Sequence, residues 1–210
     1  EATVRLLDEM GAESIILAES PGGQYNALNV GNAYRVCEML PLASGKLKLN
    51  NDFSFVSVHT DGKKLKNLHI IKPFFDSDVI IDLCKLKSHS LTGLSCATKN
   101  LYGLIPGVEK FEMHSTFPKI EDFSEMLVDL ASYVMKEKTF IAICDGILSM
   151  EGNGPTHGTP KKTDLVLVSQ SAFDLDVVAE KIIGIPGEVI HLASPMPEDM
   201  EAVWKSMKSK

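Results

Sequence analysis

Short apolar runs alternate with helical stripes along this chain. Strand-like apolar runs occur at residues 15–18, 53–59, 68–72, 79–84, 140–144 and 165–168. Apolar positions with a helical period predict helices at residues 4–10, 30–40, 120–134, 173–183 and 197–207. Because buried strands alternate with helices, we expect an α/β fold. It would be three-layered and Rossmann-like, with a mostly parallel (mixed) sheet and helices on both faces.

Two local signals refine this picture. Asp61-Gly62 lies between the runs 53–59 and 68–72, which predicts one antiparallel hairpin. Residues 151–163 are rich in glycine, proline and threonine and are expected to form a loop. No internal repeat is visible, so we expect a single domain over residues 1–210. The chain opens at Glu1, without methionine, inside a helical pattern, and we expect it to be a fragment of a slightly longer chain.

Composition and charge exclude several classes of protein. The 210 residues are 44% hydrophobic and 23% charged, which is ordinary for a globular domain. A net charge of −7 argues against nucleic acid as a partner. No apolar stretch approaches the roughly 18 residues that a membrane span needs. We therefore expect neither nucleic acid nor membrane as partner. The cysteine usage described next suits a reducing cytoplasm, so we expect a cytoplasmic protein.

The four cysteines show no ligand motif. They lie at 37, 84, 96 and 144, and no C-x-x-C is present. Zinc ribbons and ferredoxin-type clusters use closely spaced thiolates. We expect all four cysteines to be unpaired and not to share a cluster, with Cys84 and Cys144 as reduced core residues.

A cationic loop follows the strand predicted at 79–84. Lys87 and Lys99 could hold an anionic group near a helix start. His89 could move a proton near neutral pH. Lys99 follows the uncharged run 91–98, and a lysine in apolar surroundings can become a nucleophile. The alternative is a surface lysine that caps a helix.

Two further loops leave predicted strands at the same edge. Asp145 ends the strand 140–144, and Glu151 and Asn153 are polar anchors in a glycine-dense segment that matches no phosphate-loop signature. His114 is a candidate metal ligand without H-E-x-x-H spacing. Ligands of α/β folds bind where strands end. We therefore expect one cleft there, lined by His89, Lys99, Asp145 and Glu151.

Several motifs together resemble domain-of-unknown-function family 362. They are Asp78–Asp82, Lys85–His89, Lys99–Gly107, Asp145–Ile147, Met150–Pro155 and Phe173–Asp176. Many members carry a ferredoxin-like module with two four-iron clusters and are described as iron–sulfur proteins. This sequence contains no such module. The resemblance implies an iron–sulfur cluster on a missing module or on a ferredoxin-like partner.

A second resemblance concerns the spacing of His89, Gly93, Ser95 and Lys99, followed by His114. It is similar to the nickel-pincer lactate racemase family, in which the lysine carries the cofactor and a later histidine ligates nickel. The departure is Ala97-Thr98, where that family has Gly-Gly-Arg before its lysine. The resemblance implies His89 and Lys99 as catalytic residues, His114 as a metal ligand and a nickel-type cofactor.

The sequence leaves three functions open. The first is a cytoplasmic protein that binds a small molecule, an anion or a metal-containing cofactor, in redox chemistry with an iron–sulfur partner. The second is a racemase-like or isomerase-like enzyme that acts on a small acid. The third is a non-catalytic interaction domain. The expected cofactor-binding residues are Lys87, Asn100, Asp145, Glu151 and Asn153.

Overall fold

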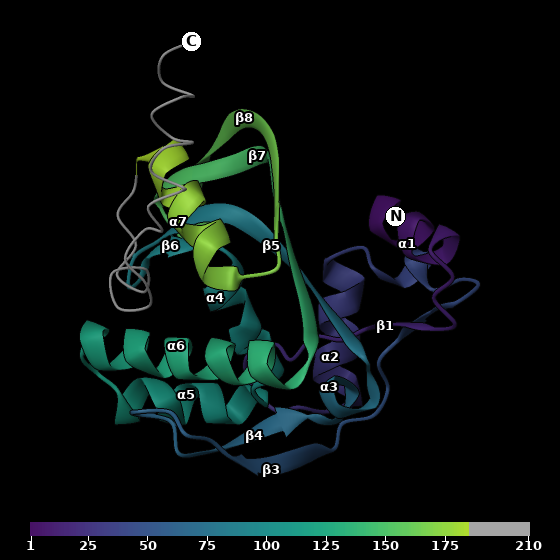
Figure 1. The fold of residues 1–210 in the computed structure, drawn as a ribbon, viewed down its shortest axis with the longest axis horizontal. Helices are drawn as coiled ribbons and strands as arrows, with labels where there is room; N and C mark the ends of the chain where they lie inside the picture. The colour runs from purple at the N-terminus through teal and green to yellow at the C-terminus, as the bar shows by residue number, and fades with distance from the viewer. Residues whose placement is uncertain (185–210) are drawn as a thin grey trace. The chain divides into compact units, whose positions relative to one another are not determined.

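The computed structural model describes residues 1–184 of the chain (Figure 1). Its helices are α1 (Ala2–Glu9), α2 (Ala27–Val36), α3 (Lys72–Asp76), α4 (Ala97–Asn100), α5 (Gly107–Thr116), α6 (Ile120–Glu137) and α7 (Ala172–Ile183), with 3-10 turns η1 (Leu40–Leu42) and η2 (Leu101–Leu104). Its strands are β1 (Ile15–Leu17), β2 (Leu47–Leu49), β3 (Phe55–His59), β4 (Asn67–Ile71), β5 (Val79–His89), β6 (Gly93–Ser95), β7 (Thr139–Asn153) and β8 (His157–Ser169). Mixed sheets with helices confirm the α/β class.

The chain divides into two compact units. The first unit comprises residues 1–59, 67–78 and 103–116. The described part of the second unit comprises residues 60–66, 79–102 and 117–184. The expectation of a single domain over residues 1–210 stays a prediction.

The first unit contains two small sheets. Strands β1 and β2 pair in parallel, so the loops after Leu17 and Leu49 leave the same end of this sheet. Strands β3 and β4 pair antiparallel from Phe55 to Ile71, which confirms the hairpin expected around Asp61-Gly62. Asn26 precedes helix α2, and its side chain accepts a hydrogen bond from the Asn29 N–H and so caps the helix.

The second unit is built on a four-stranded sheet in the order β6-β5-β7-β8. Strands β5 and β7 are parallel, whereas the outer strands β6 and β8 pair antiparallel with their neighbours. Side chains alternate in burial along β7, where Phe140, Ala142 and Cys144 are buried. Helices α4, α6 and α7 contact this sheet or one another.

Helix α6 follows from its sequence pattern. Its apolar stripe is buried, and acidic residues in its first turn and Lys136 in its last turn complement the helix dipole. Asp129 on this helix accepts backbone N–H groups of Lys64 and Leu65, at 2.6 and 2.9 Å. These bonds hold residues 60–66 within the second unit.

Two stretches contradict the sequence prediction. Residues 85–89, expected to form a loop after the strand 79–84, instead continue β5 to His89, because they pair with β6 and β7. Of residues 151–163, expected to be a loop, only 154–156 form a turn; the others are the end of β7 and the first half of β8, with Glu151 paired with Thr159. Backbone pairing overrides the low strand propensity of this stretch. Strand β8 is an outer strand of the described sheet, where Pro160 is tolerated.

Helix α7 ends as the sequence predicts, with Gly184 in a left-handed conformation. The helix expected at residues 197–207 lies outside the described residues. Within residues 1–184, no helix combines the length and apolar character needed to cross a membrane.

Candidate functional site

Two buried cysteines meet across the parallel strands of the second unit. Cys84 on β5 pairs in register with Cys144 on β7. The exposed fractions of these two residues are 4% and 0%. Because paired residues of neighbouring strands face the same side of a sheet, both thiols enter the core together.

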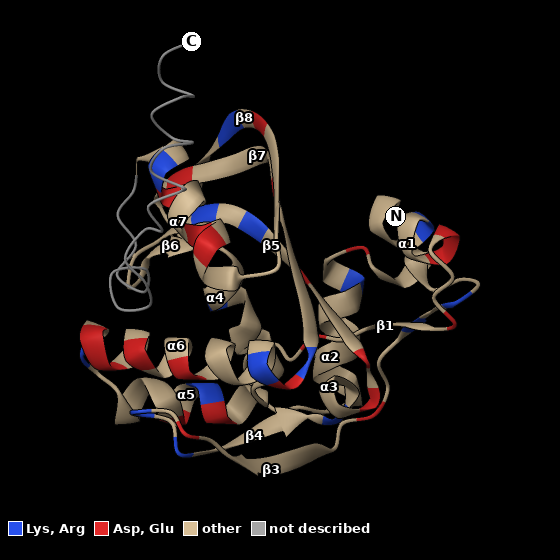
Figure 2. Cartoon of the chain, in the orientation of Figure 1, with Lys and Arg blue, Asp and Glu red and all other residues tan. Residues whose placement is uncertain are grey.

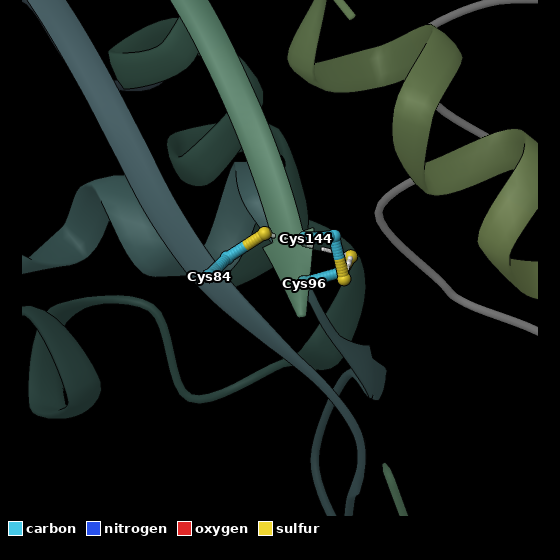
Figure 3. Close-up of side chains that lie close together, drawn as sticks. All are labelled: Cys84, Cys96 and Cys144. Carbon is cyan, nitrogen blue, oxygen red and sulfur yellow. Dashed lines mark hydrogen bonds between the residues drawn. The ribbon is translucent and has the colours of Figure 1, made fainter. Parts of the chain in front are cut away.

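A third thiol comes from a different element. Cys96 directly follows β6 and is the N-cap residue of α4, and it is 1% exposed. Its Sγ lies 3.3 Å from the Cys144 Sγ and 3.8 Å from the Cys84 Sγ (Figure 3). All three sulfur atoms lie within 4.8 Å of one another. We call Cys84, Cys96 and Cys144 the thiol cluster.

Hydrogen bonds polarise the thiol cluster. Bonds donated by the thiols of Cys84 and Cys96 stabilise the Cys144 thiolate and lower its pKa. The same bonds to Cys144 raise the pKa of Cys84 and of Cys96. The three thiols therefore share hydrogen bonds, an arrangement in which a metal ion can displace thiol protons.

A buried carboxylate supports the position of Cys96. Asp176 on α7 is 3% exposed, and its two oxygens accept the N–H groups of Ala97 at 2.7 Å and Thr98 at 2.9 Å. Burial raises the pKa of Asp176 to about 6 although these bonds favour its charged form. Asp176 thus links α7 to the two peptide groups that follow Cys96.

The proximity of three cysteines was not predicted from the sequence, and the expectation that they share no metal cluster stays a prediction. The four cysteines are free of disulfides, as expected, but three of them converge, and Cys37 alone is exposed. Sequence spacing misses the cluster because the fold, not a local motif, brings the thiols together. The available signal was register: Cys84 and Cys144 occupy equivalent positions in β5 and β7, counted from the paired residues Val79 and Thr139.

His89 lies at the end of β5 and stabilises a turn. Its Nδ1 accepts the N–H groups of Leu91 at 3.1 Å and Thr92 at 3.3 Å. Lys87 lies two residues earlier on β5, in register with Ser95 of β6. His89 therefore shapes the β5–β6 hairpin, and its catalytic role stays a prediction.

Lys99 lies on α4 against aromatic rings. Its Nζ is 4.6 Å from the centroid of the Tyr102 ring and 5.9 Å from that of Phe123. This placement is a cation–π contact, which neither sequence interpretation of Lys99 included. The next residue, Asn100, donates from Nδ2 to Asp82 Oδ1 at 2.5 Å and to the Leu83 carbonyl at 3.2 Å.

The acidic candidates of the second unit form ion pairs with lysines. Asp145 binds Lys85 at 2.8 Å, and this lysine lowers the pKa of Asp145. Glu151 binds Lys161 across the β7–β8 hairpin. Asn153, at the tip of that hairpin, pairs in register with His157. The single cleft expected for His89, Lys99, Asp145 and Glu151 stays a prediction.

Two of the predicted loops do meet. The Ser88 hydroxyl donates to the Gly152 carbonyl at 2.9 Å, and the Ser90 N–H donates to the Gly154 carbonyl at 3.3 Å. Gly154 packs so closely that a Cβ would lie 1.9 Å from the Ser88 carbonyl oxygen. The end of β5 and the turn between β7 and β8 are therefore in direct contact.

His114 belongs to the first unit, whereas the groups described above belong to the second unit. It is an exposed residue of α5, in the first unit. Among residues 1–184, the group of side chains placed to share a metal ion is the thiol cluster, which does not include His114. Its role as a ligand stays a prediction.

The first unit holds a polar cluster of its own. Burial raises the pKa of Glu19 and lowers that of Lys110, and the Lys110 ammonium donates to the Ser20 carbonyl. Nearby, Asn50 donates to the Tyr25 hydroxyl at 2.9 Å. Apart from Lys110, which lies on α5, these residues follow β1 or β2, a position where α/β proteins bind ligands.

Fold and site together define an α/β protein with a cluster of three buried thiols. The model of the family described as "Domain of unknown function (DUF362)" matches residues 1–181, and the chain belongs to this family, as its sequence motifs indicate. A relative is the thylakoid-associated protein sll1697 of Synechocystis sp., which is 33% identical over 184 residues. That match covers 87% of this chain and 54% of the relative.

One solved structure shares the fold. A crystal structure of a Thermotoga maritima protein matches with a TM-score of 0.55 at 14% identity, over 92% of this chain and 49% of that chain. The chain thus spans about half the length of both proteins.

Proposed function

We propose that this domain binds one thiophilic metal ion through the thiol cluster. The observation that carries the proposal is the convergence of three buried sulfur atoms within 4.8 Å of one another. Soft thiolate ligands select Cu(I), Zn(II) and iron–sulfur clusters among biological metals. We expected a metal-containing cofactor from the sequence, and the proposed ligands of the metal are Cys84, Cys96 and Cys144.

The size of the thiol cluster favours a single ion. Metal–sulfur bonds of about 2.3 Å place two sulfur ligands of one ion about 3.8–4.0 Å apart. The separations of 3.3 and 3.8 Å from Cys96 Sγ need only small adjustments to reach that value. An iron–sulfur cluster instead distributes its thiolates over several irons. The iron–sulfur module implied by the family resemblance is therefore a separate prediction about a partner or a missing segment.

Burial would make such a site selective and slow to exchange. The three side chains are at most 4% exposed, so water competes poorly for the ion. The Lys85 ammonium favours the thiolate form of Cys144. Because binding releases the protons of Cys84 and Cys96, affinity is expected to increase with pH.

The experiment is a metal titration of reduced protein prepared without oxygen. Cu(I) and Zn(II), each delivered from a competing chelator, should bind at one equivalent. Separate Cys84→Ser, Cys96→Ser and Cys144→Ser variants should each bind at least tenfold more weakly, as expected for loss of a ligand. Cys37→Ser is the matched control, because Cys37 is the exposed cysteine.

Two results would contradict the proposal. One is the absence of saturable binding by folded wild-type protein. The other is a loss of metal affinity in Cys37→Ser as large as the loss in the three cluster variants. Circular dichroism of each variant separates loss of ligands from loss of fold.

The other functions considered for this sequence remain predictions. They are redox chemistry with an iron–sulfur partner, an isomerase activity on a small acid through His89 and Lys99, and a non-catalytic interaction role. The cytoplasmic location also remains a prediction, because the relative's name associates that protein with thylakoids.

A further inference from the structure

Asp176 lies beneath the start of α4, far in sequence from the cysteine that it supports. Its carboxylate accepts the N–H groups of Ala97 and Thr98, the two residues directly after Cys96. Asp176 belongs to the motif Phe173–Asp176, which the function proposed above does not use. Figure 2 shows acidic bands on α7, the helix that carries this residue.

Burying a carboxylate at this place is costly. A charged side chain that is 3% exposed loses nearly all of its hydration. A helix of four residues needs no buried charge for its N-terminus, because a serine or an asparagine caps a helix at lower cost. The bidentate arrangement nevertheless fixes two consecutive peptide groups, each bound to its own carboxylate oxygen.

The three members of the thiol cluster differ in how their positions are fixed. Cys84 and Cys144 lie within the paired strands β5 and β7, whose backbone hydrogen bonds define both positions. Cys96 lies one residue beyond β6 and outside the ladder. Its backbone position depends on the turn into α4, where Asp176 binds.

We propose that Asp176 is the positioning residue of the thiol cluster, holding the peptide groups after Cys96 so that its Sγ faces Cys84 and Cys144. The expected effect of Asp176 on metal affinity rests on the proposed function. Its geometric content, the orientation of the Cys96 thiol, can be tested without metal. Supporting residues around metal ligands typically change affinity by about 10–100-fold when they are replaced.

The first test is a double-mutant cycle read out by Cu(I) affinity. Asp176→Asn should weaken binding by about 10–100-fold in the wild-type background. In the Cys96→Ser background it should change affinity by less than about twofold, because the ligand that it positions is gone. In the Cys84→Ser background it should keep its full effect.

Controls separate positioning from general loss of stability. Asp174→Asn alters an acidic residue two positions away on α7, and it should leave Cu(I) affinity unchanged. Asp176→Glu keeps the charge but moves the carboxylate, and it should weaken binding as well; it also replaces Asp176→Asn if the latter does not fold. Equal effects of the Asp176 variant in the Cys96→Ser and Cys84→Ser backgrounds would overturn the inference.

The second test uses metal-free protein and distinguishes the two proposals. Alkylation by iodoacetamide, followed by mass spectrometry, reports the accessibility of each thiol. Asp176→Asn should accelerate labelling of Cys96 at least fivefold more than labelling of Cys84 or Cys144. Uniform acceleration of all three would overturn the positioning role. Selective acceleration together with no Cu(I) binding by wild-type protein would refute only the proposed function.

Discussion

Replacing Gly107 by alanine tests the close contact between the start of α5 and the loop after β1. An alanine Cβ at Gly107 would lie 2.0 Å from the Pro21 carbonyl oxygen and 2.4 Å from that of Gly23. Both contacts are with backbone, so no side-chain rotation relieves them. Lys110, one turn further along α5, donates to the Ser20 carbonyl of the same loop. Displacing α5 would therefore also disturb the polar cluster of the first unit.

The magnitude follows from two opposing effects. Forcing an extra methyl group into a close-packed contact costs about 1–3 kcal/mol. The higher helix propensity of alanine offsets at most about 1 kcal/mol of this cost. We expect Gly107→Ala to lose about 1–2 kcal/mol of unfolding free energy. For a protein of this length, that loss lowers the Tm by roughly 2–8 °C.

Gly31 offers a matched control in the same unit. It lies inside α2, and a Cβ there meets nothing within 4 Å. Gly31→Ala should therefore stabilise the protein by about 0.5–1 kcal/mol through helix propensity alone. Urea unfolding followed by circular dichroism measures both variants. A Gly107→Ala protein as stable as Gly31→Ala would refute the packing argument.

Three further predictions concern charge and metal. Lys99→Met should lose about 0.5–2 kcal/mol of stability through its contact with Tyr102 and leave metal affinity unchanged; urea unfolding and Cu(I) titration check this, and a tenfold loss of affinity would contradict it. Burial raises the folded-state pKa of Glu19 above 4.5, so wild-type stability should fall as pH increases from 4.5 through that raised pKa. The Glu19→Gln variant should not show this decrease in stability. A difference in stability between wild-type protein and Glu19→Gln that stays constant over this pH range would contradict the prediction. Free metal at about 100 times its Kd should stabilise wild-type protein by about 2.7 kcal/mol, reversibly on chelation, whereas Cys144→Ser should show little of this gain in a thermal melt.

Much of the fold could be predicted from the sequence. The hairpin of β3 and β4 follows from alternation around Asp61-Gly62, and α6 follows from its apolar stripe and terminal charges. Both features are local, so a single stretch of sequence contains the information. The β7–β8 hairpin was missed beyond residue 144 because cross-strand pairing, which is not local, overcomes a composition typical of loops.

The site was less predictable for the same reason. His89 and Lys99 were candidates because their side chains can act in catalysis. In the structure, His89 stabilises a turn and Lys99 contacts an aromatic ring. The thiol cluster depends on the register of β5 with β7 and on the placement of Cys96 by the turn after β6. Register is set by the whole sheet, so spacings of 12 and 48 residues between these cysteines carry no visible signal.

The most direct test of the account is X-ray absorption spectroscopy of the reduced protein loaded with one equivalent of Cu(I) or Zn(II). The thiol cluster predicts a shell of three sulfur atoms at about 2.3 Å around a single ion. It also predicts no metal–metal scattering and loss of one sulfur in Cys96→Ser. A shell dominated by nitrogen or oxygen, or one unchanged in the Cys96→Ser variant, would contradict the claim that Cys84, Cys96 and Cys144 form the metal site.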